Sequence, residues 1–257
     1  MGLLNDVFRQ SLEAGLANRV VGKYLASVLD RLMLPKDMYQ LFTDFEAIAG
    51  NELPEWLGTA DTSAAGTPTM DFVANADGGV WAMKFDTTNE VETITLYSGD
   101  HLTIDAAKTP IVEFRIKIEP DVTGAGGAFA AGDKFVVGLA TARNATLDSV
   151  TAMAWFRMEG ANANILVETD DGTTDTDDKD TTIDWVANTY ILGRIDLSNL
   201  SDVRFYLDDV DVTPTTMSLA ALTGTTNFQF FMEGQKAAAT NKDHRFSIDF
   251  LDIRAKR

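Results

Sequence analysis

From residue 52 to the C-terminus, short β-like runs follow one another and no helical pattern lies between them. The clearest run is 111–118, where apolar and charged side chains alternate, as in a strand with one buried and one solvated face. Such runs predict a mainly β protein, an antiparallel two-sheet sandwich, and long loops at 120–133 and 170–184 favour a jelly-roll order over a meander. The comparable runs are 80–85, 91–97, 134–140, 152–158, 165–169, 190–197, 203–207, 228–233 and 245–253.

The first 50 residues lack this pattern and predict a helical arm. Large apolar residues recur every four positions from Leu4 to Leu32, which is helical spacing, and Pro35 ends the helix after Leu34. A second short helix is predicted over 37–48. The sequence therefore divides into an N-terminal helical arm, 1–50, and a jelly-roll β-sandwich domain, 51–257. We expect the arm to anchor or assemble the protein through an apolar stripe formed by Leu4, Phe8, Leu12, Leu16, Val20, Tyr24 and Leu32.

The apolar face of this arm must be covered by something. Three partners could cover it: the protein's own β domain, the same helix from sister subunits, or a foreign surface. Binding to a membrane surface is the weaker alternative, because the polar side of the helix carries Asp6, Glu13 and Asp30 instead of a Lys/Arg-rich face. No segment has the roughly 18–20 uninterrupted apolar residues of a membrane helix, and the N-terminus does not read as a targeting peptide.

Charge is distributed unevenly between the two parts. The whole chain carries 21 Lys+Arg against 39 Asp+Glu, a net charge of −18. Residues 1–36 carry 5 basic and 3 acidic residues, a balance of +2, which leaves −20 for the rest. A strongly acidic body repels phosphate backbones, so nucleic-acid binding is not expected. With no Cys and only two His, the chain has no disulfides, zinc knuckles or thiol nucleophile.

Three segments carry a resemblance to a known family. The run Val203-Arg204-Phe205-Tyr206-Leu207-Asp208-Asp209, preceded by 190–197 and closed by a terminal strand over 246–254, resembles the concanavalin A-like lectin/glucanase sandwich. The resemblance covers about residues 52–257 and implies a jelly roll whose last strand returns to the sheet centre. Asp209 departs from it, because that turn usually has Gly there.

The segments around Trp81 and Glu113-Phe114-Arg115 are similar to jelly-roll modules of tailed-phage virion proteins. We therefore expect a non-enzymatic structural virion protein: a capsid decoration (cement) protein or a virion-attached fibre component. Its expected partners are itself, as a homotrimer, and the major capsid protein or another virion protein, and we expect no cofactor and no catalytic or metal-binding residue.

The alternative function is a carbohydrate-binding, lectin-like adhesion module that binds a cell-surface glycan. Lectin-like sandwiches present concave sheet faces, on which Trp81, Trp155, Trp185 or Tyr190 can stack against sugar rings. Burial in the core is the more common fate of such aromatic residues. A glycan array distinguishes this function from the structural one.

Catalysis is the third hypothesis, and the sequence offers little for it. Glucanases that share the resemblance carry an E-x-D-x-E strand, which this chain lacks. The nearest pair is Asp249 and Asp252 on the final strand, whose odd spacing places them on opposite faces unless a bulge intervenes. His101 and His244 have no partner at a recognisable motif spacing, and we expect both to be solvated loop residues.

One acidic segment, 170–180, stands out by its six Asp residues among threonines. Carboxylates and hydroxyls can ligate Ca²⁺, but the EF-hand pattern fails because Gly172 is misplaced and no Glu closes the loop. An exposed, charge-dense loop is the favoured interpretation, with a weak, optional Ca²⁺ site as the alternative.

Overall fold

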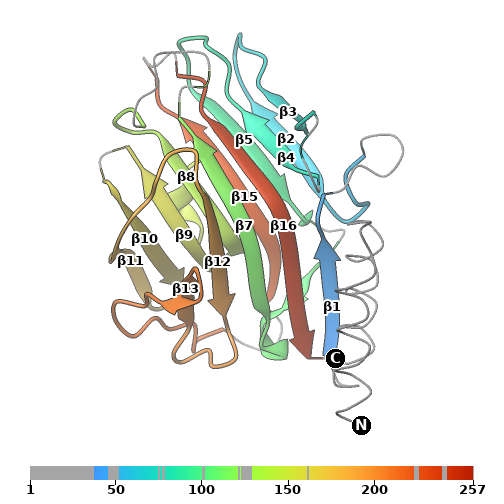
Figure 1. The fold of residues 1–257 in the computed structure, drawn as a ribbon. Coiled ribbons are helices and arrows are strands. Elements are labelled where there is room, and N and C mark those ends of the chain that lie inside the picture. The colour runs from blue at the N-terminus through green and yellow to red at the C-terminus, as the bar shows by residue number, and fades with distance from the viewer. Residues whose placement is uncertain are drawn as a thin grey trace, which may run out of the picture.

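The computed structural model describes residues 38–45, 52–74, 76, 79–99, 102–120, 122, 129–160, 162–222, 226–238 and 242–256. Two antiparallel eight-stranded sheets lie face to face and form a sandwich (Figure 1). The sandwich predicted from the alternating pattern is therefore confirmed. In the part of the chain that is described, no helix is long and apolar enough to cross a membrane.

Sheet A runs in the order β14-β13-β12-β7-β16-β4-β3, with β1 also paired to β16. The final strand β16 is therefore central, as the resemblance implies, and its C-terminal end lies beside the start of β1 (Figure 1). The strands of sheet A are β1 (Met38–Thr43), β3 (Thr69–Phe72), β4 (Trp81–Lys84), β7 (Ile111–Glu119), β12 (Tyr190–Asp196), β13 (Arg204–Leu207), β14 (Val210–Asp211) and β16 (Arg245–Lys256).

Sheet B runs in the order β11-β10-β9-β8-β15-β5-β2, with β6 also paired to β15. Its strands are β2 (Gly58–Thr62), β5 (Glu92–Tyr97), β6 (Ile104–Asp105), β8 (Lys134–Ala140), β9 (Met153–Glu159), β10 (Asn164–Asp170), β11 (Asp175–Asp184) and β15 (Asn227–Lys236). All ten runs expected from the sequence are strands, and six strands are additional: β1, β2, β3, β6, β11 and β14.

The core lies between the sheets and is rich in phenylalanine. Phe135 of sheet B stacks on Phe246 of sheet A with ring centroids 4.4 Å apart. Phe156 packs edge-on against Phe114 and Phe205. Burial of such rings is worth about 25 cal/mol per Å² of apolar surface, and this is the main force that holds the sheets together.

The helix predicted over 37–48 is wrong, because residues 38–43 form strand β1. In β1, Tyr39 and Leu41 oppose Ala255 and Ile253, which are buried core residues of β16. Pairing with the open edge of β16 therefore decides the structure of this segment, because its helical spacing is short and ambiguous. The longer predicted helix and the seven assembly residues from Leu4 to Leu32 lie outside the described residues.

The acidic segment is not a plain loop either, since residues 175–184 form strand β11 at the edge of sheet B. Asp has a low β propensity, which is why the sequence predicted a loop. An edge strand tolerates charge, because one of its sides is not paired and charged side chains there discourage pairing with another chain. Its pairing with β10 contains two register shifts.

Candidate functional site

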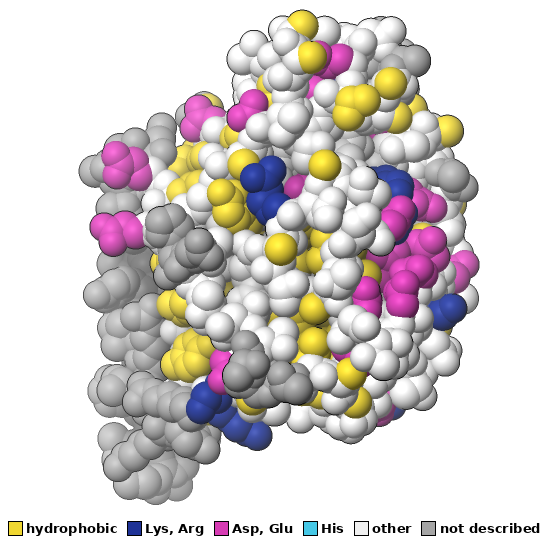
Figure 2. Space-filling view, turned by 180° about the vertical axis from the view of Figure 1, so that it is seen from behind, with side chains coloured by type: hydrophobic (Ala, Val, Ile, Leu, Met, Phe, Trp, Pro, Cys, Tyr) yellow, Lys and Arg dark blue, Asp and Glu magenta, His cyan; other side chains and the backbone are white. Residues whose placement is uncertain are grey.

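The outer face of sheet B carries a second apolar cluster, separate from the core between the sheets. The segment 141–152, which connects β8 to β9, lies across this face and buries Leu147 and Val150 against it. Figure 2 views the molecule from behind relative to Figure 1 and shows apolar side chains in the middle of that view. The cluster consists of Val136, Ala140, Leu147, Val150, Met153, Trp155 and Phe231, with Tyr97 packed against it.

Beside this cluster, an arginine, a tyrosine and a glutamate from three segments meet. The guanidinium of Arg143, on the covering segment, lies over the Tyr97 ring at 5.3 Å from its centroid. Arg143 Nε is 3.8 Å from the carboxylate of Glu233 on β15. Glu233 is almost fully buried and accepts hydrogen bonds from Thr95 Oγ1 at 2.7 Å and Gln235 Nε2 at 2.9 Å. Burial raises the pKa of Glu233, although these hydrogen bonds and Arg143 oppose the shift.

A second charged cluster lies on the same face, toward β11. The buried Glu168 accepts hydrogen bonds from Trp155 Nε1 and, at 2.8 Å, from Arg157 Nη1. Arg157 also binds Asp148 of the covering segment at 2.7 Å. Burial raises the pKa of Glu168 to about 8, a hydrogen bond with the Asp178 carboxyl acts in the same direction, and Arg157 opposes both. This cluster ties the covering segment and β11 to the sheet.

The two buried glutamates are too far apart to act as a glycosidase pair. Glu233 is on β15 and Glu168 on β10, with β8 and β9 between them. Three steps of about 4.8 Å between strands separate them by about 14 Å, whereas the carboxyl pairs of glycoside hydrolases lie about 5–10 Å apart.

The pair on the last strand is engaged in ion pairs. A register shift between Ile248 and Phe250 bulges β16 and brings Asp249 and Asp252 onto the outer face together. Asp249 accepts from Arg115 at 2.6 Å, and Asp252 accepts from Gln40 at 2.8 Å. The bulge therefore removes the face difference that the spacing predicts, and both carboxylates serve to join neighbouring strands.

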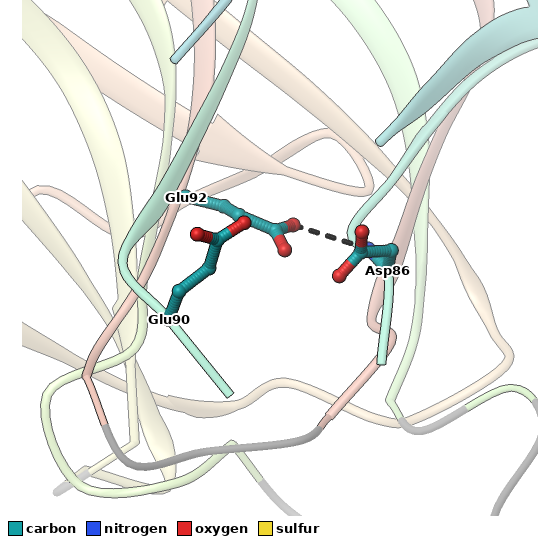
Figure 3. A group of neighbouring side chains, drawn as sticks. All are labelled: Asp86, Glu90 and Glu92. Carbon is teal, nitrogen blue, oxygen red and sulfur yellow. Dashed lines mark hydrogen bonds between the residues drawn. The ribbon is translucent and has the colours of Figure 1, made fainter. Parts of the chain in front are cut away.

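Three carboxylates near the start of β5 approach the geometry of a metal site. Asp86, Glu90 and Glu92 point toward one another, with one oxygen of each within 4.8 Å of the others (Figure 3). The buried Lys236 takes the place of a cation: its Nζ lies 2.6 Å from Glu92 and donates to the backbone oxygens of Asp86 and Thr88 at 2.8 and 2.7 Å.

The remaining oxygens of this group hold the loop that precedes β3. Glu90 accepts from the backbone N–H groups of Ala64 and Ala65 at 3.0 and 2.8 Å. Burial raises the pKa of Glu92 to about 7, a hydrogen bond with Asp86 adds to the shift, and Lys236 opposes it. These contacts make the group a clamp between the loop, β5 and β15, held by hydrogen bonds and an internal ammonium.

The aromatic residues proposed as sugar platforms are mostly covered by other side chains. Trp81 and Trp155 are buried, and Trp185 stacks on Phe129 at 5.0 Å. Tyr190 is half-buried on the outer face of sheet A, where Arg115 covers its ring at 4.4 Å. The sequence analysis did not identify Tyr97 or Arg143 as site residues. Glu233 could have been found, because it is a single acidic residue within an apolar run.

The expectation that His244 is a solvated loop residue is wrong. His244 is fully buried, and its Nε2 lies 2.9 Å from Asp133, which is also buried. Phe129 packs on the imidazole ring at 4.7 Å. The other histidine, His101, lies outside the described residues.

No protein-family model matches the sequence, and a search of curated proteins finds no match. Solved structures do match. A protein of unknown function, SO2946 from Shewanella oneidensis MR-1, has a TM-score of 0.60 at 15% identity, over 94% of this chain and 95% of that chain.

Two structures of carbohydrate-binding proteins also match. The carbohydrate recognition domain of Emp47p has a TM-score of 0.55 at 12% identity, over 87% of this chain and 97% of that one. Winged bean acidic lectin, solved with methyl-α-D-galactose, has a TM-score of 0.56 at 9% identity, over 85% and 98%. At such identities the likeness shows the fold, which is the lectin-like sandwich that the resemblance implied.

Proposed function

We propose that this protein is a non-catalytic, lectin-like carbohydrate-binding module. The binding surface is the outer face of sheet B, next to the covering segment. The lectin-like fold supports this function over the structural one, and the spacing of the buried glutamates speaks against a glycosidase.

The observation that carries the proposal is the grouping of Tyr97, Arg143 and Glu233 on that face. An aromatic ring edge, a guanidinium and amide-bearing neighbours such as Gln235 are the groups that proteins use to orient small polar ligands on a largely apolar surface. Before a ligand arrives, hydrogen bonds from Thr95 and Gln235 hold Glu233 in place, and the Tyr97 ring lies against the guanidinium of Arg143. Groups positioned in advance lower the entropic cost of binding.

A glycan array with the full chain tests the function, followed by calorimetric titration of any ligand found. Tyr97→Ser on the outer face of sheet B is expected to weaken binding at least about tenfold. Tyr206→Ser removes a tyrosine from the outer face of sheet A and is expected to leave affinity unchanged. The proposal fails if no glycan binds above background, or if the Tyr206 variant loses binding and the Tyr97 variant keeps it.

A second candidate function rests on the apolar stripe from Leu4 to Leu32, which the sequence places in the N-terminal arm. We propose that this segment joins subunits into a homotrimer and attaches the protein to the major capsid protein of a virion. Because β1 begins at Met38, the test is a chain that starts at Lys36, compared with the full chain by native mass spectrometry and by binding to purified capsids. The shorter chain is expected to fold as a monomer that no longer binds. A trimeric short chain, or a monomeric full chain, contradicts this candidate.

A further inference from the structure

Three arginines of the described part of the chain lie over tyrosine rings, and they differ in what else they bind. Arg194 lies 4.0 Å from the Tyr206 centroid, and Arg115 lies 4.4 Å from that of Tyr190. In both, a carboxylate on the same face completes the arrangement. Asp209 is 3.4 Å from Arg194 Nη1, and Asp249 is 2.6 Å from Arg115 Nη1.

Arg143 is the exception. Its shortest ion-pair distance is 3.8 Å, from Nε to Glu233, which is too long for a hydrogen bond. Its guanidinium donates no hydrogen bond to any described residue. Thr95 donates to one oxygen of Glu233 and Gln235 donates to the other, and these two hydrogen bonds hold the carboxylate in its position. A guanidinium has five N–H donors. Those of Arg143 have no protein acceptor within hydrogen-bond distance among the residues described, and its side chain is 32% exposed.

The guanidinium is nevertheless held in place. Tyr97 lies beneath it, and Gln235 Nε2 donates to the backbone oxygen of Ala145, two residues further along the covering segment, at 3.2 Å. Burial of Leu147 fixes the same segment to the sheet. An arginine positioned in this way loses little rotamer freedom when a ligand binds.

The chemistry of the ligand follows from what the site offers. The Tyr97 face toward Arg143 is covered, so that face does not serve as a platform for a sugar ring. Glu233 is only 1% exposed, so its oxygens offer little to sugar hydroxyl donors. What remains is a set of N–H donors with a positive charge, and their best partner is a planar or tetrahedral anion bound by two parallel hydrogen bonds.

The surrounding charge permits such a ligand although the protein is acidic overall. Asp148, on the same covering segment, is neutralised by Arg157 and Lys134 at 2.7 and 3.1 Å. The exposed carboxylates of β11 gather at one side of the face, over the far edge of sheet B (Figure 2). Strands β10, β9 and β8 separate that edge from β15 and β5.

We infer that Arg143 is the specificity-determining residue of the glycan site and selects saccharides that carry an anionic group, either a carboxylate or a sulfate. This inference rests on the proposed carbohydrate-binding function. The anion pairs with the N–H groups of Arg143, and the rest of the saccharide lies along the Tyr97 and Gln235 side of the face.

Matched glycan pairs test this directly. The full chain is titrated with carboxylated oligosaccharides and their carboxyl-reduced forms, and with sulfated oligosaccharides and their desulfated forms. The wild-type protein is expected to prefer one anionic form by about tenfold or more, the value of a charge-assisted hydrogen-bond pair. The pair that shows the preference identifies the anion.

Variants separate the role of Arg143 from a general charge effect. Arg143→Gln is expected to abolish the preference, and Arg143→Lys to retain part of it as a point charge without the bidentate geometry. Arg194→Gln changes the net charge equally, removes the matching stack on sheet A and is expected to keep the preference. Thermal unfolding of each variant shows that the fold is intact.

The possible results separate the inference about Arg143 from the proposed carbohydrate binding. Retention of the anionic preference by Arg143→Gln, or its loss in Arg194→Gln, overturns the inference. Binding of neutral forms as tightly as anionic ones also overturns it but leaves carbohydrate binding standing. Absence of binding to every glycan overturns both the inference and the proposed function.

Discussion

At Arg157, one guanidinium faces four carboxylates: Asp148, Glu159, Glu168 and Asp178. Glu168 is the buried member, and burial first and the neighbouring Asp178 second raise its pKa to about 8. An acid with a raised pKa in the folded state binds its proton more tightly there than in the unfolded chain. Its stabilising contribution is therefore complete below the unfolded pKa and is lost as the pH rises through the folded pKa.

This linkage predicts a pH dependence of stability. Between about pH 4.5 and 8, Glu168 should lower the free energy of unfolding by up to about 1.4 kcal/mol per pH unit. Glu168→Gln keeps the hydrogen-bonding shape without titrating, so its slope over this interval should be shallower. Urea unfolding at several pH values checks this, with Glu159→Gln as the control on the same arginine. Equal slopes for wild type and Glu168→Gln contradict the prediction.

The turn between β13 and β14 places two non-glycine residues at positive φ, Asp208 at 47° and Asp209 at 66°. The left-handed region costs an L-residue about 1–2 kcal/mol, and glycine avoids that cost. Asp208 offsets part of this conformational cost, because its carboxylate accepts a hydrogen bond from the Leu192 backbone N–H at 3.0 Å. Asp209→Gly is therefore expected to raise the free energy of unfolding by up to about 1 kcal/mol, and Asp208→Gly to raise it less or lower it. Denaturant unfolding of both variants checks the order.

Among the elements, β1 decides where the sandwich begins. It pairs with β16 over six positions, and Phe45, two residues after its end, is 1% exposed in the core. Residues 38–45 therefore belong physically to the sandwich, although their helical spacing assigned them to the arm.

Removing β1 should destabilise the sandwich. A chain that begins at residue 51 loses β1 and Phe45, and loss of a buried Phe side chain alone costs about 3–5 kcal/mol. A chain that begins at Lys36 keeps both and should unfold at the same denaturant concentration as the full chain. Guanidinium unfolding of the three chains measures this, and equal midpoints for the two shortened chains would show that β1 contributes nothing.

The acidic segment that includes β11 should not bind calcium strongly. Several of its carboxylates already have partners: Asp171 accepts from the backbone N–H groups of Thr174 and Ala221, and Asp180 from Asn164. Calcium at millimolar concentration should shift the melting temperature by less than about one degree, since a ligand stabilises only in proportion to its binding. Calorimetry with calcium and then a chelator checks this, and a chelator-sensitive shift of several degrees would contradict it.

Over the whole molecule, the charges that give the net charge of −18 are distributed unevenly. Acidic side chains line the β11 edge, while the outer face of sheet A carries paired charges such as Arg115 with Asp249 and Arg204 with Asp202. On the outer face of sheet B, the covering segment adds Arg143, whose guanidinium donates no hydrogen bond to any described residue. Net charge thus says little about the ligand, because local pairing decides which charges remain available.

The sequence by itself determined the class of fold and ten of its strands. Alternation with a period of two is a local property, which a residue and its next neighbours express without help from the rest of the chain. The same reasoning led to a helix at 37–48 and a loop at 170–184, because local spacing and propensity contain no information about a sheet edge formed by distant residues. The tertiary structure decided those two elements.

Only the tertiary structure could assemble the candidate site. Thr95 and Glu233 are 138 residues apart, and Arg143 reaches them from a third segment. His244 and Asp133 are 111 residues apart and became a buried pair in place of a solvated histidine. Contacts of this kind depend on which strands pair and which connection crosses a face. The sequence therefore determined where strands form, and long-range pairing decided which side chains meet and which remain open to a ligand.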